Sequence, residues 1–220
     1  MIPRATIDAL TRLHAYRDSI QWRLTPMGIE TPAGIETWGG QPKTSRIFWR
    51  EYGDITTTWA SAVQVPAELI VACALTESRG DPMSIREEPG YMSDLATPSK
   101  ISAGLMQLLI STASEIMRTL GVHVDRAWLM VPDNAIRAGA SFIASQVGKT
   151  GMDPPKVACA YNAGGIYYQG GEENRWKMRQ FPIGTGHHAD RFVKWFNECM
   201  GMFGADGTAP ECSFCKALNP

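Results

Sequence analysis

One segment of this sequence has to be buried wherever the chain folds. Residues 66–76 begin with a proline, and every side chain from Leu69 to Leu75 is apolar. Proline suits the start of a helix, and a helix that is apolar on every face belongs in a protein core. Glu77 is the first carboxylate after this run. The segment therefore predicts a buried helix that presents an acidic side chain at its end.

The position of Glu77 predicts an acid–base role. Burial disfavours the charged form of a carboxyl group and raises its pKa, so the group can still hold a proton near neutral pH. A general acid needs that protonated form. The alternative is an ordinary helix-terminal glutamate with a structural hydrogen bond, and other motifs must decide between the two.

Composition narrows the class of protein. The chain has 220 residues, 44% of them hydrophobic, and a net charge of −1, which suits a globular protein with one substantial core. Without a basic run we expect no nucleic-acid partner. No apolar run reaches the ~18 residues that span a bilayer, so we expect no membrane insertion. The first 20 residues lack the apolar core of a signal peptide, so an extracytoplasmic substrate would require delivery by another agent.

Periodicity predicts a mainly α-helical protein with an irregular or short-stranded N-terminal extension. We expect an extension over residues 1–44, a catalytic domain over 45–200 and a loosely packed tail over 201–220. Gly-Ile-Glu-Thr occurs at 28–31 and again at 34–37, which favours a small hairpin. Apolar spacing predicts helices from recurring positions over 7–20, 48–62, 66–76, 134–147 and 188–200, and another helix opens at 153–155.

Capping signals and loops complete this prediction. Thr112-x-x-Glu115 resembles a capping box for a helix that stops at Gly121, and Asp133 is the expected cap of the next helix. Residues 83–103 and 165–187 are predicted loops, because both are marked by proline or glycine.

Four ordered motifs point to one family. They are Glu77-Ser78, Gly104-Leu-Met-Gln107, Ala135-Ile-Arg-Ala-Gly139 and Ala160-Tyr-Asn-Ala-Gly164. Over roughly residues 45–200 the chain resembles the catalytic domain of soluble lytic transglycosylases, in the lysozyme-like superfamily, with a phage-type enzyme as the preferred form. The resemblance implies a mainly α, lysozyme-like fold.

The resemblance also implies an activity on peptidoglycan glycan strands. The family cleaves the β-1,4 bond between N-acetylmuramic acid and N-acetylglucosamine and leaves a 1,6-anhydro end, without a metal or cofactor. It implies that Glu77 is the acid/base and that the Tyr161 hydroxyl points toward Glu77. The implied substrate-binding residues come from the same motifs: Ser78, Gly104, Met106, Gln107, Asn162, Ala163 and Gly164. Of these, Met106 is as much a candidate for the core.

Two other functions stay open at this stage. The gap between Glu77 and Gln107 is longer than the family usually shows, and the extra segment contains Glu87, Glu88 and Asp94. One of these could supply the second carboxylate of a hydrolytic muramidase. A non-catalytic glycan-binding or virion protein with a vestigial site is the other alternative. A phage particle or a secretion apparatus is the expected delivery partner.

Three further features depart from the family or lie outside its motifs. His188 falls near the position where the family often has a glutamate. Cys212 and Cys215 form a Cys-x-x-Cys pair, which we expect to be thiols or a local disulfide rather than half of a zinc site. Trp176 is the best tryptophan candidate for stacking on a sugar, although a packing role is the stronger expectation.

Overall fold

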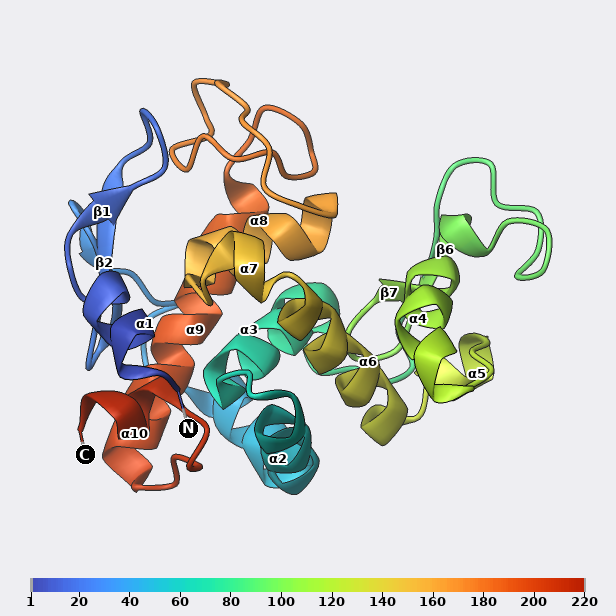
Figure 1. Cartoon of the computed structure of the whole chain (residues 1–220), viewed down its shortest axis with the longest axis horizontal. Helices are drawn as coiled ribbons and strands as arrows, with labels where there is room; N and C mark the ends of the chain where they lie inside the picture. The colour runs from blue at the N-terminus through green and yellow to red at the C-terminus, as the bar shows by residue number, and fades with distance from the viewer. Residues whose placement is uncertain (1, 220) are drawn as a thin grey trace.

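The apolar helix α3, Ala67–Ser78, lies at the centre of the fold. Ala67 to Leu75 are all buried, and the helix packs against α2, α6, α8 and α9 (Figure 1). It ends where Arg79, at φ 58°, and Gly80, at φ 85°, take the left-handed conformation that terminates helices. The predicted buried helix is therefore confirmed.

The computed structural model describes residues 2–219 and is mainly α-helical. The other helices are α1 Arg4–Leu10, α2 Lys43–Val63, α4 Ile110–Met117, α5 Arg126–Leu129, α6 Pro132–Ser145, α7 Val147–Thr150, α8 Pro154–Ala163, α9 His187–Asp206 and α10 Phe214–Leu218. Two short 3₁₀ helices, η1 Pro98–Lys100 and η2 Arg118–Leu120, join longer elements.

A four-stranded antiparallel sheet lies within residues 14–35, near the N-terminus. Its strands, in spatial order, are β1 His14–Ala15, β2 Gln21–Thr25, β3 Gly28–Thr31 and β4 Gly34–Ile35. The two Gly-Ile-Glu-Thr copies pair as the predicted hairpin, with Glu30 opposite Ile35. The Asn197 side chain of α9 accepts a hydrogen bond from the Ile29 backbone and donates to its carbonyl. The hairpin is thereby fixed to the helical core.

A second antiparallel sheet replaces part of a predicted loop. Its strands are β5 Ile85–Glu87, β6 Ile101–Ala103 and β7 Leu108–Leu109. All three residues of β6 are buried. The prediction of a polar loop over the whole of 83–103 was therefore wrong at both ends. The polar turn between β5 and β6 conceals the strand pattern, because each strand is only three residues long.

Three local predictions were also wrong. The first helix ends at Leu10, because the chain turns into β1 and pairs with β2. Thr112 lies inside α4, which begins at Ile110, so it caps nothing. Asp133 lies in the first turn of α6 and accepts a hydrogen bond of 2.8 Å from the Trp59 indole.

The C-terminal tail is packed and not loose as the sequence suggested. α9 continues to Asp206, and Cys212, Phe214 and Cys215 are buried. The Glu68 carboxyl group in the first turn of α3 accepts hydrogen bonds from the backbone N–H groups of Phe214, at 3.1 Å, and Cys215, at 2.9 Å. Burial raises the pKa of Glu68 to about 7 against these hydrogen bonds. Glu68 therefore fixes the tail to the start of the central helix.

We predict that Glu68→Ala lowers the free energy of unfolding by about 2 kcal/mol or more, because it leaves two buried N–H groups without an acceptor. The measurement is denaturant unfolding at pH 6. Glu211→Ala is the matched control, because Glu211 lies in the same tail with its side chain 87% exposed. Equal stability of the two variants would contradict the anchoring role.

The sign of the pH dependence follows from the raised pKa of Glu68. Its folded value of about 7 lies above the ordinary 4.5, so its contribution to stability is fully present below pH 4.5 and is lost as the pH rises through 7.

Candidate active site

Glu77 occupies the last turn of α3, where the helix leaves the core. Its side chain is 17% exposed, so most of the carboxyl group is out of water. This burial is the main cause that raises the pKa of Glu77 to about 7; the positive charges of Arg191 and Arg86 oppose it. At neutral pH the group is therefore present in both its acid and base forms.

His188 lies directly beside Glu77 in the first turn of α9. Its Nε2 atom is 3.5 Å from Glu77 Oε1, and the side chain is only 3% exposed. Burial, aided by the charge of Arg191, lowers the pKa of His188 to about 3. The contact thus joins a neutral imidazole and a carboxyl group. Sequence reasoning noted His188 only as a departure from the family, and it missed Arg86 and Arg191 altogether.

Tyr161 lies on α8, near Glu77, with its hydroxyl group turned to the backbone. The hydroxyl donates a hydrogen bond of 2.7 Å to the Met106 carbonyl and also contacts the Cys73 thiol. A phenol has one proton to donate. Since that proton goes to Met106, Tyr161 does not donate to Glu77 as the resemblance implied. It holds the Gly104–Gln107 segment against α8.

The Gln107 side chain forms its hydrogen bonds within the protein, one of them to the same segment. Its amide nitrogen donates to the carbonyls of Ser84, at 2.8 Å, and Gly104, at 3.0 Å. Its amide oxygen accepts a hydrogen bond of 3.0 Å from the Ser102 hydroxyl. Both amide protons are used inside the protein, so the side chain closes the turn between β6 and β7 and leaves no proton for a sugar.

Three other predicted contacts are structural in their surroundings. Ser78 donates to the Leu105 carbonyl at 2.8 Å, which fixes the segment to the end of α3. Met106 is 1% exposed, and a Cβ at Gly139 would collide with its side chain. Met106 is thus a core residue, not a sugar contact. A Cβ at Gly104 would run into the Leu129 carbonyl, so this glycine serves close packing on α5.

The end of α8 is more open. The Asn162 Oδ1 atom accepts a hydrogen bond of 2.6 Å from the Phe181 backbone and so holds the second long loop. Ala163 is half-buried, and the exposed Gly164 ends the helix at φ 74°. Asn162 is also only partly buried, so a polymer could reach all three residues.

Two features outside the motifs have structural roles. Trp176 is fully buried and donates a hydrogen bond of 2.8 Å to Asp190, so it cannot stack on a sugar. Cys212 and Cys215 are free thiols beside Glu68. Within residues 2–219 there is no group of three or more metal-ligating side chains.

The acidic side chains of the β5–β6 connection are paired with arginines. Arg126 binds Asp94 through two of its nitrogens, at 3.0 and 2.6 Å, and this pairing lowers the pKa of Asp94. Glu87 lies 3.9 Å from the same arginine. Glu88 is 2.8 Å from Arg86. The pairing with Arg126 favours the charged form of Asp94, whereas the surroundings of Glu77 favour the protonated form.

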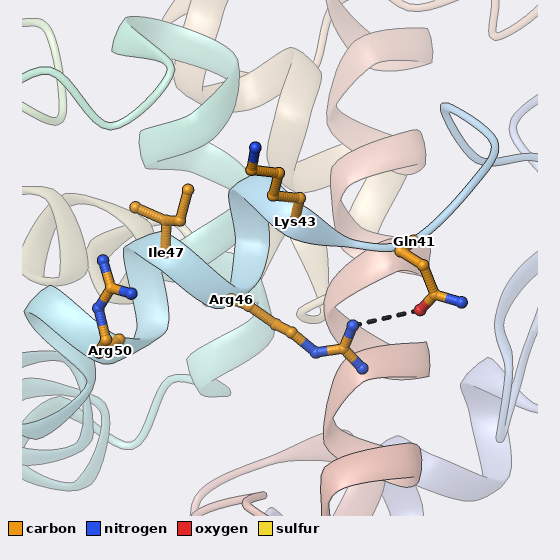
Figure 2. A pocket seen from close by; sticks show the side chains of 5 residues that line it. All are labelled: Gln41, Lys43, Arg46, Ile47 and Arg50. Carbon is orange, nitrogen blue, oxygen red and sulfur yellow. Dashed lines mark hydrogen bonds between the residues drawn. The ribbon is translucent and has the colours of Figure 1, made fainter.

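A surface cavity lies away from these residues. It has a volume of about 550 Å³ at the start of α2 and is lined by Gln41, Lys43, Arg46, Ile47 and Arg50 (Figure 2). Arg46 is held there by Gln41 and by Asp206. The lining offers cations but no carboxyl group to donate a proton, so it is not the site predicted from the motifs.

The comparisons with known proteins agree with the motifs. The model of the transglycosylase SLT domain matches residues 54–179, more than half of the chain. This chain belongs to that family. The matched range contains Glu77 and all the predicted substrate-binding residues, whereas His188 lies beyond it. A comparison with curated proteins finds no match.

Solved structures resemble the SLT domain at low identity. An inactive mutant of the lytic transglycosylase Slt from Pseudomonas aeruginosa is 20% identical, with a TM-score of 0.52 over 73% of this chain and 25% of that one. The 70-kDa soluble lytic transglycosylase from Escherichia coli is 23% identical, with a TM-score of 0.42 over 51% of this chain and 17% of that one. A complex of the 70-kDa enzyme with bulgecin A is 21% identical, with a TM-score of 0.44 over 70% of this chain and 22% of that one.

These structures are much longer proteins, and this chain spans a quarter or less of their length. The likeness to the Pseudomonas protein establishes a mainly α, lysozyme-like fold. Within residues 2–219, no helix is long and apolar enough to cross a membrane.

We predict that Tyr161→Phe in the SLT domain lowers the free energy of unfolding by about 1–3 kcal/mol, because the buried Met106 carbonyl loses its donor. Thermal or denaturant unfolding measures this. Tyr167→Phe is the control, since Tyr167 is 45% exposed. Unchanged stability of Tyr161→Phe, together with a fall in turnover, would instead assign the hydroxyl to Glu77.

Proposed function

We propose that this chain is a peptidoglycan lytic transglycosylase with Glu77 as its single acid/base. The substrate is the β-1,4 bond between N-acetylmuramic acid and N-acetylglucosamine, and the product carries a 1,6-anhydro ring. The observation that supports this most is the buried carboxyl of Glu77, whose pKa of about 7 suits both halves of the reaction.

In the proposed reaction, the carboxyl group of Glu77 first donates a proton and then accepts one. Protonated Glu77 donates its proton to the glycosidic oxygen while the bond from C1 of the muramic acid breaks. The N-acetylglucosamine leaves with that oxygen as a hydroxyl group. Carboxylate Glu77 then takes the proton from the 6-hydroxyl of the muramic acid as O6 bonds to C1. The enzyme recovers its proton, and no water is consumed.

The charges around Glu77 suit this cycle. Arg191 and Arg86 attract the carboxylate that forms midway, and burial favours the acid that starts the reaction. A much lower pKa would leave too little of the protonated form at neutral pH, and a much higher pKa would make Glu77 too weak an acid for the first proton transfer. The opposing effects keep both forms accessible.

The other motif residues hold the backbone next to the site in place. Ser78, Gln107 and Tyr161 hold the Gly104–Gln107 segment through its own backbone carbonyls. Catalytic groups require a rigid second layer, because small displacements from the reacting atoms cost rate. We infer that the glycan contacts come from Asn162, Ala163 and Gly164 and from the backbone at Glu77. Delivery by a phage particle or a secretion apparatus stays a prediction.

We predict that Glu77→Gln abolishes clearing of purified sacculi while the variant keeps the circular dichroism of the parent, because the amide cannot carry the proton. Mass analysis of the soluble products from the parent protein should find anhydro ends, which are one water lighter than reducing ends. Activity near that of the parent in a folded Glu77→Gln variant would contradict the proposal. A parent protein without activity would favour a non-catalytic glycan-binding protein.

A hydrolytic muramidase is the second candidate function, and one contact near Glu77 favours it. Glu88 binds Arg86, whose charge acts on Glu77, so this acid is the one most closely connected to the site. A hydrolase would need it, or Glu87 or Asp94, to activate water.

We predict that Glu87→Gln, Glu88→Gln and Asp94→Asn each reduce the rate less than about tenfold, equivalent to about 1.4 kcal/mol of barrier, because the proposed mechanism needs no second carboxylate. The rates come from release of soluble muropeptides. A loss at Glu88 as large as that at Glu77, with hydrated ends in the products, would establish the muramidase instead.

A further inference from the structure

The buried side chain of His188 lies beside the proposed catalytic carboxyl group. It lies in the first turn of α9, and its side chain is 3% exposed. Its Nε2 atom is 3.5 Å from Glu77 Oε1. The neighbouring His187 is exposed, so the chain turns one histidine of this pair inward and the other outward.

Four elements contribute groups that affect the charge of Glu77 or contact it. α3 brings Cys73, β5 brings Arg86, α8 brings Tyr161, and α9 brings Arg191 and His188 itself. Burial raises the pKa values of Cys73 and Tyr161 well above their ordinary values, so both keep their protons. Burial, aided by the charge of Arg191, keeps His188 neutral. Of Glu77, Cys73, Tyr161 and His188, only Glu77 thus changes charge near neutral pH.

We propose that His188 is a positioning residue for Glu77: a neutral imidazole that contacts Oε1 and closes that side of the carboxyl group to water. The catalytic role of Glu77 on which this rests is the proposed function above. With Oε1 occupied by the imidazole, Oε2 is the oxygen left for the substrate.

A neutral imidazole suits a group that must be acid and then base. Its ring carries one N–H donor and one acceptor nitrogen, and the two tautomers exchange these roles. The ring can therefore face either the protonated or the ionised carboxyl without a change in its own charge. A charged partner would favour the carboxylate alone and lower the pKa of Glu77. A purely apolar partner could not orient the carboxyl group of Glu77 through a polar contact.

The test compares three variants by the pH dependence of kcat/KM on soluble glycan strands. Activity of the parent should fall as the pH rises through about 7, where Glu77 loses its proton. In His188→Ala, water enters beside the carboxyl, so this fall should move to lower pH by about one unit, with roughly a tenfold loss of kcat. His188→Gln keeps a neutral polar group of similar reach and should restore the pH at which activity falls. His187→Ala, at the exposed neighbour, should match the parent.

A second measurement does not need the reaction. Carboxyl-carbon NMR of the free protein gives the pKa of Glu77 directly, and the same downward shift is expected in His188→Ala but not in His188→Gln. If the parent cleaves no glycan, this titration still decides the positioning role, while the proposed function alone fails. If His188→Ala does not fold, His188→Asn serves in its place, because its shorter side chain moves the polar group away from Glu77.

Two results would overturn the proposal. In the first, His188→Ala loses rate while the pKa of Glu77 and the pH profile stay where they are, which assigns His188 to packing only. In the second, His188→Ala matches the parent in both measurements.

Discussion

The burial of α3 on every side is the constraint on which the rest of the structure depends. A helix without a polar face cannot lie at the surface, so other elements must cover all of it. α2, α6, α8 and α9 do so. The two carboxyl groups of this helix are then forced into surroundings with little water, and burial raises the pKa of both Glu68 and Glu77 to about 7.

The two acids differ in what surrounds their oxygens. Glu68 is fully buried, and two backbone N–H groups of the C-terminal tail satisfy it. Glu77 is 17% exposed and faces a neutral histidine and two more distant arginines. A raised pKa alone therefore does not mark a catalytic residue. The open, incompletely satisfied carboxyl is the one able to exchange a proton with a substrate.

Keeping Glu77 in this state costs stability. A pKa raised from 4.5 to about 7 corresponds to roughly 3 kcal/mol against the folded state when the group is ionised. That is a large share of the free energy of unfolding of an ordinary domain. The ordered contacts behind the site offset this cost. Tyr161 and Gln107 fix the same short segment, and Asn197 fixes the N-terminal hairpin to the helices.

The sequence was a good guide to whatever depends on local pattern. The apolar run of α3, the hairpin of the Gly-Ile-Glu-Thr doublet and the helix opened by Pro154 all follow from residues close in the chain. The tail and the roles of Gln107 and Tyr161 did not follow, because their partners lie far away in the sequence or are backbone carbonyls. A motif match names residues that a family keeps, but it does not separate those that touch substrate from those that hold the site together.

His188 shows that residues outside the motifs can also lie at the site. It belongs to none of the four motifs, and its contact with Glu77 joins positions more than a hundred residues apart. No local pattern distinguishes it from the exposed His187. Only the packing of α9 on α3 brings it to the carboxyl group.

The central claim is that burial, at the end of one apolar helix, sets the proton affinity of Glu77. The direct measurement is a carboxyl-carbon NMR titration of the parent protein, with Glu77→Gln and Glu68→Gln to assign the two buried signals. The account predicts that the signal lost in Glu77→Gln titrates near pH 7. A value for Glu77 at or below the ordinary 4.5 would contradict it.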